Sequence, residues 1–263
     1  MTDSPLITLT TDFGVGSRYV AAMKGVILSI NPQARVIDLS HGIPHQDVRQ
    51  GAIALAETAP LFPPGTIHVA VVDPGVGTDR RIVYAQIGTQ QFVAPDNGLL
   101  SRLAAAERPF KIVSLDEPRF WLPQVSSTFH GRDIMAPVAA RLGLGLSPDE
   151  LGRSLEALIE LPWPEVQCVA QKITGEVVEV DSFGNLITNI TREMLAGVPT
   201  NETVTSTCDE HVTQGIFRTY SDQPAMTLIA LVGSGGRLEL AIVGESAAAM
   251  LGVQVGTPVQ VTW

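Results

Sequence analysis

The sequence predicts an α/β fold in two parts: an N-terminal α/β domain with a largely parallel sheet, and a smaller C-terminal all-β barrel domain. Over residues 1–161, short apolar runs alternate with helical patterns, which is typical of a parallel sheet covered by helices. Over residues 168–263, short strand patterns are separated by Gly, Asn and Ser turns, which is typical of a barrel or a sandwich. The prolines of Leu161–Pro164 make a stiff connection, so we assign residues 162–167 as the linker.

Each element of the first domain has a local signal. Apolar residues that alternate or run together predict strands, and apolar residues spaced three and four apart predict helices. The first helix ends at Asn31-Pro32, because the residue before a proline avoids the helical conformation. The expected strands are 6–10, 36–39, 66–72, 82–87, 91–94 and 110–114, and the expected helices are 18–30, 46–58, 97–106 and 133–142.

The second domain is expected to contain little helix. Its strand patterns are short and are separated by turn residues, which is typical of an all-β domain. The expected strands are 173–181, 186–190, 202–207, 227–232, 237–242 and 258–262, and the one expected helix is 245–251.

Composition narrows the classes of partner. The chain of 263 residues has a formal net charge of −10 and no basic patch, which argues against a nucleic-acid partner. The negative charge mildly favours a cationic small substrate, although solubility explains it equally well. No apolar run approaches the ~18 residues of a membrane span, so we expect no membrane partner. The N-terminal residues lack the pattern of a signal peptide, so we expect a cytoplasmic protein.

The residues that bind metals in other proteins are few and scattered here. Cys168 and Cys208 lie far apart and outside any CxxC pattern, which argues against a zinc site or a disulfide framework. The spacing of His41 and His45 does not indicate a metal site either. We therefore expect no metal.

Polar residues follow two predicted strands, at the position where open α/β sheets place ligand chemistry. Asp73 ends a buried strand and is followed by a Pro-Gly turn and by Arg80, which suits a ligand site or an ordinary loop with a surface ion pair. Asp12 follows the first strand. Its carboxylate suits a ribose diol or a capping turn before the helix at Arg18.

Two further clusters offer donors, acceptors and an aromatic face. His130 stands at a helix entrance, where the positive end of the helix favours a neutral imidazole that can act as a base. A bond from His130 to a backbone carbonyl is the other interpretation. Asp181, Phe183 and Asn185 suit an amine, a flat heterocycle and its hydrogen-bonding edge respectively. The same five-residue segment also suits a simple β-turn.

Taken in order, these motifs resemble the SAM hydroxide adenosyltransferases, a family related to SAM-dependent fluorinases and chlorinases. The resemblance covers nearly the whole chain. It implies an α/β domain followed by a β-barrel, and a homotrimer whose sites lie between the first domain of one subunit and the second domain of the next. The matching segments are TDFG at 11–14, VVDPGVGT at 71–78, PDNGLL at 95–100, FHGRD at 129–133 and DSFGNLITN at 181–189.

The resemblance also implies roles for residues of this chain. The catalytic triad that marks the hydroxide branch falls on Asp73, Arg80 and His130. The implied substrate contacts are Asp12 to the ribose, Asp181 to the methionine amine, Phe183 stacked on adenine, Asn185 at the adenine edge and Ser234 near the methionine carboxylate. Two positions depart from relatives: Ser17 replaces a common acidic residue, and Gly131 replaces the halide-binding serine of fluorinases.

The implied reaction is hydrolysis of S-adenosyl-L-methionine (SAM) to adenosine and L-methionine, by attack of an activated water on ribose C5′. SAM is then the substrate, and neither a cofactor nor a metal is required. Arg80 would stabilise the developing hydroxide, His130 would accept the proton and Asp73 would orient them. The alternatives are a SAM-dependent chlorinase and a SAM- or adenosine-binding protein without turnover.

Overall fold

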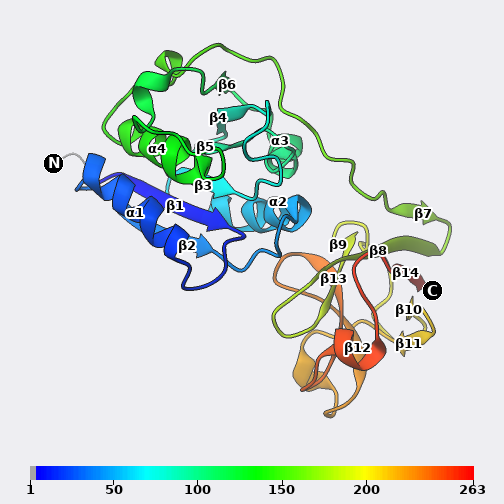
Figure 1. Cartoon of the computed structure of the whole chain (residues 1–263). Helices are drawn as coiled ribbons and strands as arrows, with labels where there is room; N and C mark the ends of the chain where they lie inside the picture. Colours follow the sequence, from blue (N-terminus) through cyan, green and yellow to red (C-terminus); the bar gives the residue numbers. More distant parts are fainter. Residues whose placement is uncertain (1–3) are drawn as a thin grey trace. The chain divides into compact units, whose positions relative to one another are not determined.

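The computed structural model describes residues 4–263, which form two compact units (Figure 1). The first unit extends to Leu161 and the second spans Pro162–Trp263. Across the described residues, no helix combines the length and the apolar character that a membrane crossing demands.

The first unit is built on a six-stranded mixed sheet with the order β2-β1-β3-β5-β4-β6. The pairings β1/β2, β1/β3 and β3/β5 are parallel, whereas β4 is antiparallel to both β5 and β6. Only Gly88 and Thr89 join β4 to β5, and so short a connection permits only an antiparallel hairpin. The strands are β1 (Leu6–Thr11), β2 (Arg35–Ser40), β3 (Ile67–Val71), β4 (Ile82–Ile87), β5 (Gln90–Pro95) and β6 (Lys111–Ser114).

Helices cover both faces of this sheet, with α1 and α4 on one face and α2 and α3 on the other (Figure 1). Strand β3 shows why the sequence folds this way. Val69 and Val71 belong to the core under α1 and α4, whereas Ala70 and Val72 belong to the core under α2 and α3. This two-residue alternation buries the strand on both faces. The helices are α1 (Arg18–Ile30), α2 (Val48–Thr58), α3 (Ser101–Ala106) and α4 (Ala136–Leu142).

Two predicted helices begin later than their patterns indicate. The α-helix expected from residue 97 starts at Ser101, because Asn97 accepts from Leu99 N and donates to Val72 O, which holds a turn. The α-helix expected from residue 133 starts at Ala136, after one π-helical turn over Gly131–Met135. π-helical turns are frequent at functional sites.

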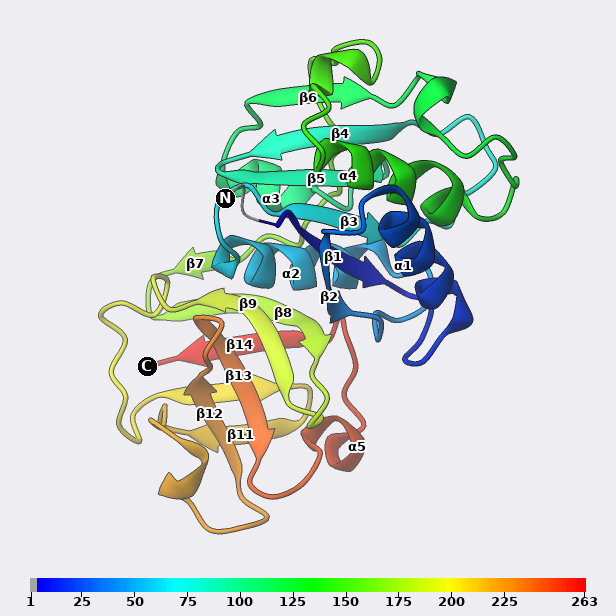
Figure 2. The ribbon, with the colours of Figure 1, turned by 90° about the vertical axis from the view of Figure 1, so that its left-hand side faces the viewer.

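The second unit is an antiparallel sheet of eight strands that is nearly barrel-shaped (Figure 2). Its order is β11-β10-β14-β8-β9-β13-β12, with β7 paired to β8. The end strands β11 and β12 approach each other, because the Thr213 hydroxyl donates to Leu228 O at 2.8 Å. The strands are β7 (Gln167–Val169), β8 (Lys172–Val180), β9 (Leu186–Thr191), β10 (Thr205–Cys208), β11 (His211–Gln214), β12 (Leu228–Val232), β13 (Arg237–Ile242) and β14 (Pro258–Thr262).

Sequence patterns missed the two short strands β7 and β11 and started β10 too early. Strand β10 begins at Thr205, because the Asn201 side chain accepts from Thr203 N and so forms a turn where a strand was expected. The predicted helix is present as α5 (Ala247–Leu251), and the Ser246 hydroxyl caps it by accepting from Ala249 N.

Candidate active site

A hollow of about 330 Å³ opens at the C-terminal ends of the parallel strands β1 and β3 in the first unit. The ends of parallel strands lie at one edge of a sheet, so side chains that follow each strand meet there. The lining residues are Asp12, Phe13, Tyr19, His45, Gln46, Val71, Asp73, Val76, Thr128, Phe129, His130 and Gly131.

Arg80 contacts both Asp73 and His130, two residues that line this pocket. Its Nε lies 2.9 Å from both carboxylate oxygens of Asp73, and its Nη2 donates to Asp73 Oδ2 and also, at 2.9 Å, to His130 Nδ1. The side chains of Arg80 and Asp73 are only 11% and 5% exposed. Solvent therefore screens this ion pair weakly, in contrast to an ordinary surface pair.

The hydrogen bond from Arg80 fixes the tautomer of His130. A guanidinium has only donors, so His130 Nδ1 must be the acceptor and a neutral ring carries its proton on Nε2. Burial, with the neighbouring Arg80 charge, lowers the pKa of His130 below its usual 6.5. The imidazole is therefore neutral at pH 7.

The loops that carry these residues are fixed by backbone contacts. Gly77 has a φ of +81°, and a Cβ there would lie 2.4 Å from Ser127 O, so the turn after Asp73 packs directly on the segment before His130. The buried Asp133 accepts from Ser126 N at 2.8 Å and also pairs with Arg132. Together these contacts set the position of His130 relative to Arg80.

Asp12 lies in the same pocket and is almost completely buried. Its Oδ2 accepts from Gln46 N at 2.8 Å, and within residues 4–263 no hydrogen bond engages its Oδ1, so this oxygen can accept from a ligand. Gln46 has a φ of 62°, an unusual conformation for a residue with a side chain, and such strain often occurs at ligand sites. The N-cap of α1 is Ser17, which accepts from Tyr19 N, so the capping interpretation of Asp12 is wrong.

Gly131 forms part of the pocket wall and has little room for a side chain. A Cβ at this position would lie 3.2 Å from a Val71 methyl and 3.4 Å from Met23 Sδ. Val71 and Met23 therefore leave little space at this position for a serine side chain.

The sequence predictions missed three aromatic residues of this pocket. Phe13, Tyr19 and Phe129 contact one another edge to face, with ring centroids 5.2–5.9 Å apart. Two of them stand next to predicted site residues, Phe13 after Asp12 and Phe129 before His130. This adjacency could have indicated that Phe13 and Phe129 belong to the site. It was not decisive, because an aromatic residue at either position also fits the hydrophobic core.

In the second unit, Asp181, Phe183 and Asn185 lie in one turn between β8 and β9. Asp181 Oδ1 accepts from Phe183 N and Asn185 N, at 2.9 and 2.8 Å, and Oδ2 accepts from Asn185 Nδ2 at 3.0 Å. The carboxylate thus holds the turn together, in agreement with the β-turn that the sequence also suited. Its Oδ2 keeps a lone pair that a ligand can use. Phe183 is 77% exposed, so its ring face is open.

Ser234 lies exposed in the turn between β12 and β13. Its neighbour Gly233 packs on Glu239, because a Cβ on Gly233 would lie 2.3 Å from Glu239 Oε2.

Tyr220 and Glu239 also belong to this region, and the sequence predictions missed both. The Tyr220 hydroxyl donates to Glu239 Oε1 and lies 3.5 Å from Asn185 Nδ2. Burial raises the pKa of Glu239, and burial together with Glu239 raises the pKa of Tyr220. The signal for Glu239 was an acidic residue in the middle of the apolar strand RLELAI.

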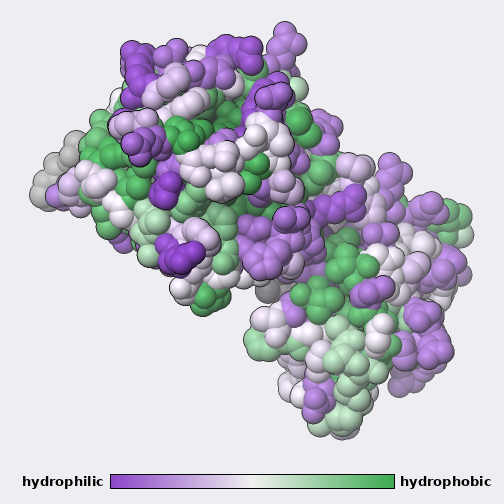
Figure 3. All heavy atoms as spheres, in the orientation of Figure 1, coloured by the Kyte–Doolittle hydropathy of each residue, from purple (hydrophilic) through white to green (hydrophobic). Residues whose placement is uncertain are grey.

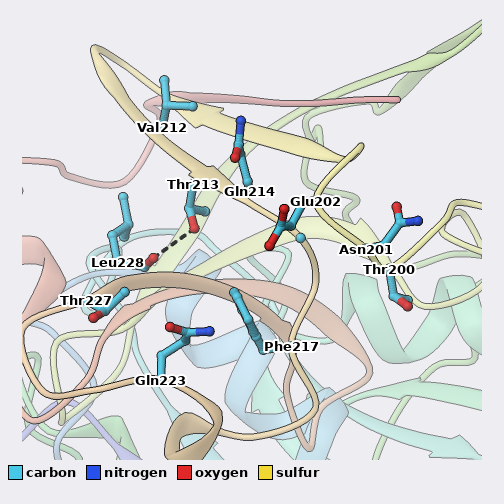
Figure 4. Close-up of a pocket in the computed structure, with 11 residues that line it drawn as sticks. Thr200, Asn201, Glu202, Val212, Thr213, Gln214, Phe217, Gln223, Thr227 and Leu228 are labelled. Atoms are coloured by element: carbon cyan, nitrogen blue, oxygen red, sulfur yellow. Dashed lines mark hydrogen bonds between the residues drawn. The ribbon is translucent and has the colours of Figure 1, made fainter.

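The predicted site residues thus gather in two places. Asp12, Asp73 and His130 line the pocket of the first unit, and Arg80 holds two of them. The other four lie in turns of the second unit. A separate hollow of about 500 Å³ near β11 and β12 is lined by none of the predicted residues (Figure 4).

Comparison with known proteins gives consistent matches to one family. The SAM hydroxide adenosyltransferase N-terminal domain matches residues 7–152, and the C-terminal domain of the same family matches residues 175–260. A Salinispora arenicola protein named (R)-S-adenosyl-L-methionine hydrolase is 42% identical over 265 residues, with 100% of this chain and 99% of the relative covered.

A solved structure and a more distant relative extend this comparison. The crystal structure of an uncharacterized conserved protein from Thermotoga maritima has a TM-score of 0.92 at 33% identity, covering 98% of this chain and 100% of that chain. A Nocardia brasiliensis protein named fluorinase is 27% identical over 215 residues, which is 72% of each chain. The hydrolase is thus more similar to this chain than the fluorinase is.

Proposed function

The chain belongs to the SAM hydroxide adenosyltransferase family, and from that premise we propose that it is an enzyme that hydrolyses SAM to adenosine and L-methionine. The observation that carries this proposal is the contact between Arg80, Asp73 and His130. In this contact one cation bonds to a carboxylate and to a neutral imidazole, and the latter two line the pocket. Groups of these kinds can activate a water, which supports the proposal.

In the proposed mechanism the attacking water takes the place of the direct Arg80–His130 hydrogen bond. Arg80 Nη2 then donates to the water oxygen, and the water donates a proton to His130 Nδ1, the ring atom that has the lone pair. Asp73 keeps the guanidinium in place through its contacts with Nε and Nη2. The imidazole is a competent acceptor because burial keeps it neutral at pH 7.

The bond changes balance without a general acid. The water oxygen attacks ribose C5′ and the C5′–S bond breaks, with its electron pair passing to sulfur. The sulfonium leaves as the neutral thioether of methionine, and the proton on His130 returns to solvent. Stabilisation of the developing hydroxide by a donor such as Arg80 contributes ~3–4 kcal/mol, and base catalysis by His130 contributes a rate factor of about 10²–10⁴.

The substrate contacts are part of the same proposal. Asp12 Oδ1 would accept from a ribose hydroxyl, and Asp181 Oδ2 would accept from the methionine amine. The open face of Phe183 would stack on adenine, with Asn185 at the adenine edge and Ser234 near the methionine carboxylate. These contacts are supported by the free acceptor on each carboxylate and by the exposure of Phe183. No cofactor or metal has a role in this scheme.

Incubation with SAM in ¹⁸O-water, with and without chloride, tests the reaction. We expect adenosine that carries the label at the 5′-oxygen, together with methionine, in both conditions. Formation of 5′-chloro-5′-deoxyadenosine would instead identify a chlorinase, and saturable binding of unchanged SAM would identify a binding protein.

Arg80→Ala and His130→Ala should lose most turnover while they retain SAM binding, since both residues act mainly in the transition state.

A further inference from the structure

The amide of Asn185 is held by two acceptors on its nitrogen side. One Nδ2 proton points to Asp181 Oδ2 at 3.0 Å, and the other points to the Tyr220 oxygen at the longer distance of 3.5 Å. Within the described part of the chain, no hydrogen bond engages Asn185 Oδ1. The amide therefore has its donors occupied and its acceptor free.

Tyr220 can accept from Asn185 only because its own proton is used elsewhere. A phenol has one donor and can accept in addition, and the Tyr220 hydroxyl donates to Glu239 Oε1. Glu239 is buried, at 5% exposure, on the central part of β13. Without a carboxylate at that position, the Tyr220 proton could turn toward Asn185 and oppose the Nδ2 proton.

We propose that Tyr220 and Glu239 are positioning residues that hold the Asn185 amide with its oxygen free, and that this orientation selects a 6-amino purine over a 6-oxo purine. The inference rests on the proposed function, in which Asn185 lies at the adenine edge. A 6-amino group donates to Asn185 Oδ1. A 6-oxo group brings a second acceptor against that oxygen, and an unpaired buried acceptor is unfavourable.

The first test compares nucleosides on the wild-type protein by isothermal titration calorimetry. Adenosine, inosine and purine riboside differ only at the purine ring edge near position 6. We expect adenosine to bind most tightly, purine riboside less tightly and inosine most weakly, with inosine at least about tenfold weaker than adenosine. Equal binding of adenosine and inosine overturns the inference while leaving SAM hydrolysis intact. If adenosine does not bind, the inference is also wrong, whereas the proposed function fails only if SAM yields no adenosine in the ¹⁸O-water experiment.

The second test measures the inosine-to-adenosine ratio of Kd in variants. Tyr220→Phe removes one oxygen atom, and Glu239→Gln keeps the shape but offers an amide that can donate to Tyr220. Both should lower the ratio at least about threefold, because the Asn185 amide is freer to turn. Tyr84→Phe is the control, since it likewise removes a tyrosine hydroxyl that donates to a side-chain oxygen, here that of Gln91 at 3.1 Å in the first unit, away from Asn185.

The ratio separates positioning from general stability. A structural loss would weaken both nucleosides equally, and the Tyr84→Phe control should leave the ratio unchanged. If Tyr220→Phe and Glu239→Gln fold and keep the wild-type ratio, the inference is wrong. If neither folds, the nucleoside series on the wild-type protein decides it alone.

Discussion

At the residue scale, the guanidinium of Arg80 connects two side chains of the first-unit pocket, Asp73 and His130. Arg80 contacts Asp73 through Nε and Nη2 and contacts His130 through Nη2, so one rigid group connects the other two side chains. A lysine at this position has one nitrogen and could not reach both partners in the same way.

The pH dependence of turnover should follow the protonation of His130. Because the pKa of His130 lies below 6.5, kcat/KM should be level near pH 7 and fall as the pH drops through that lower value. Protonation converts Nδ1 from an acceptor into a donor and opposes Arg80. A pH–rate profile checks this. His130→Gln should abolish the acidic limb and lower turnover by about 10²–10⁴-fold, and an unchanged limb in that variant would contradict the assignment.

Asp12→Asn should weaken ligands that contain ribose. The variant keeps an oxygen to accept from Gln46 N but loses the charge, and a hydrogen bond to a charged group is worth about 1.5–3 kcal/mol. Calorimetry should therefore show adenosine and SAM weakened alike, by roughly 10- to 150-fold. Methionine is the control ligand, and its affinity should not change. Equal loss for methionine would indicate a damaged fold instead.

An Asp181→Asn variant would change more than one predicted substrate contact. The sequence-based scheme predicts that Asp181→Asn weakens SAM and methionine but spares adenosine. The structure shows that Asp181 also holds Asn185 and its own turn. A loss of adenosine affinity in that variant would therefore report on Asn185 as well as on the amine contact.

Much of the site could be predicted because its residues follow elements that the sequence marks clearly. Asp12 and Asp73 come directly after strands of apolar residues, and His130 comes directly before a helical pattern. Tyr220 and Glu239 could not be paired in this way. They lie 19 residues apart, and their contact depends on the tertiary fold of the second unit, for which the sequence holds no local signal.

At the element scale, long periodic segments were predicted well and short ones were not. The bounds of α1 and of β4 are those that the sequence patterns predict, since each has a full period of apolar positions and a clear end signal. Strand β7 has three residues, all exposed, so it offers no alternation to detect. The first sheet is mixed, whereas a largely parallel sheet was predicted, because the two-residue link between β4 and β5 forces these strands to be antiparallel.

The turn after Asp73 gives a test at this scale, with a matched control. Gly77 and Gly145 both have positive φ, but a Cβ at Gly77 would meet Ser127 O, whereas a Cβ at Gly145 would meet open space. Gly145→Ala should therefore cost only the backbone strain, about 1 kcal/mol. Gly77→Ala should cost more in chemical denaturation and should also lower kcat/KM by displacing the segment before His130. Equal effects of the two variants would mean that the Ser127 contact is unimportant.

At the scale of the whole molecule, the predicted substrate contacts are divided between two units. Apolar surface is visible on both units in Figure 3. Exposed apolar side chains include Val15 in the first unit and Phe183 and Met226 in the second. Side chains of this kind are what an oligomer would cover. The family resemblance predicts that this assembly is a trimer with composite sites.

Mixing two inactive variants tests the composite site. Asp12→Ala affects the first unit and Asp181→Ala affects the second, so a mixed trimer should contain a site with both residues intact. Co-expression of the two variants should restore part of the activity, whereas each alone stays inactive. Light scattering should give the mass of three chains of 28.0 kDa each. A monomer at micromolar concentration would refute the assembly.

Because the second sheet is not fully closed, we expect local unfolding in this unit to begin between β11 and β12. Among the described residues, no continuous ladder pairs β11 with β12, and the segment that connects these strands in the chain carries Tyr220. Amide hydrogens near Phe217 and Tyr220 should therefore exchange with solvent sooner than those of β8, β9 and β13, which are paired on both sides. Adenosine should slow exchange in that segment in the wild-type protein, and should slow it less in Tyr220→Phe. The gap in the sheet would then be the place where ligand binding alters the local opening of the fold.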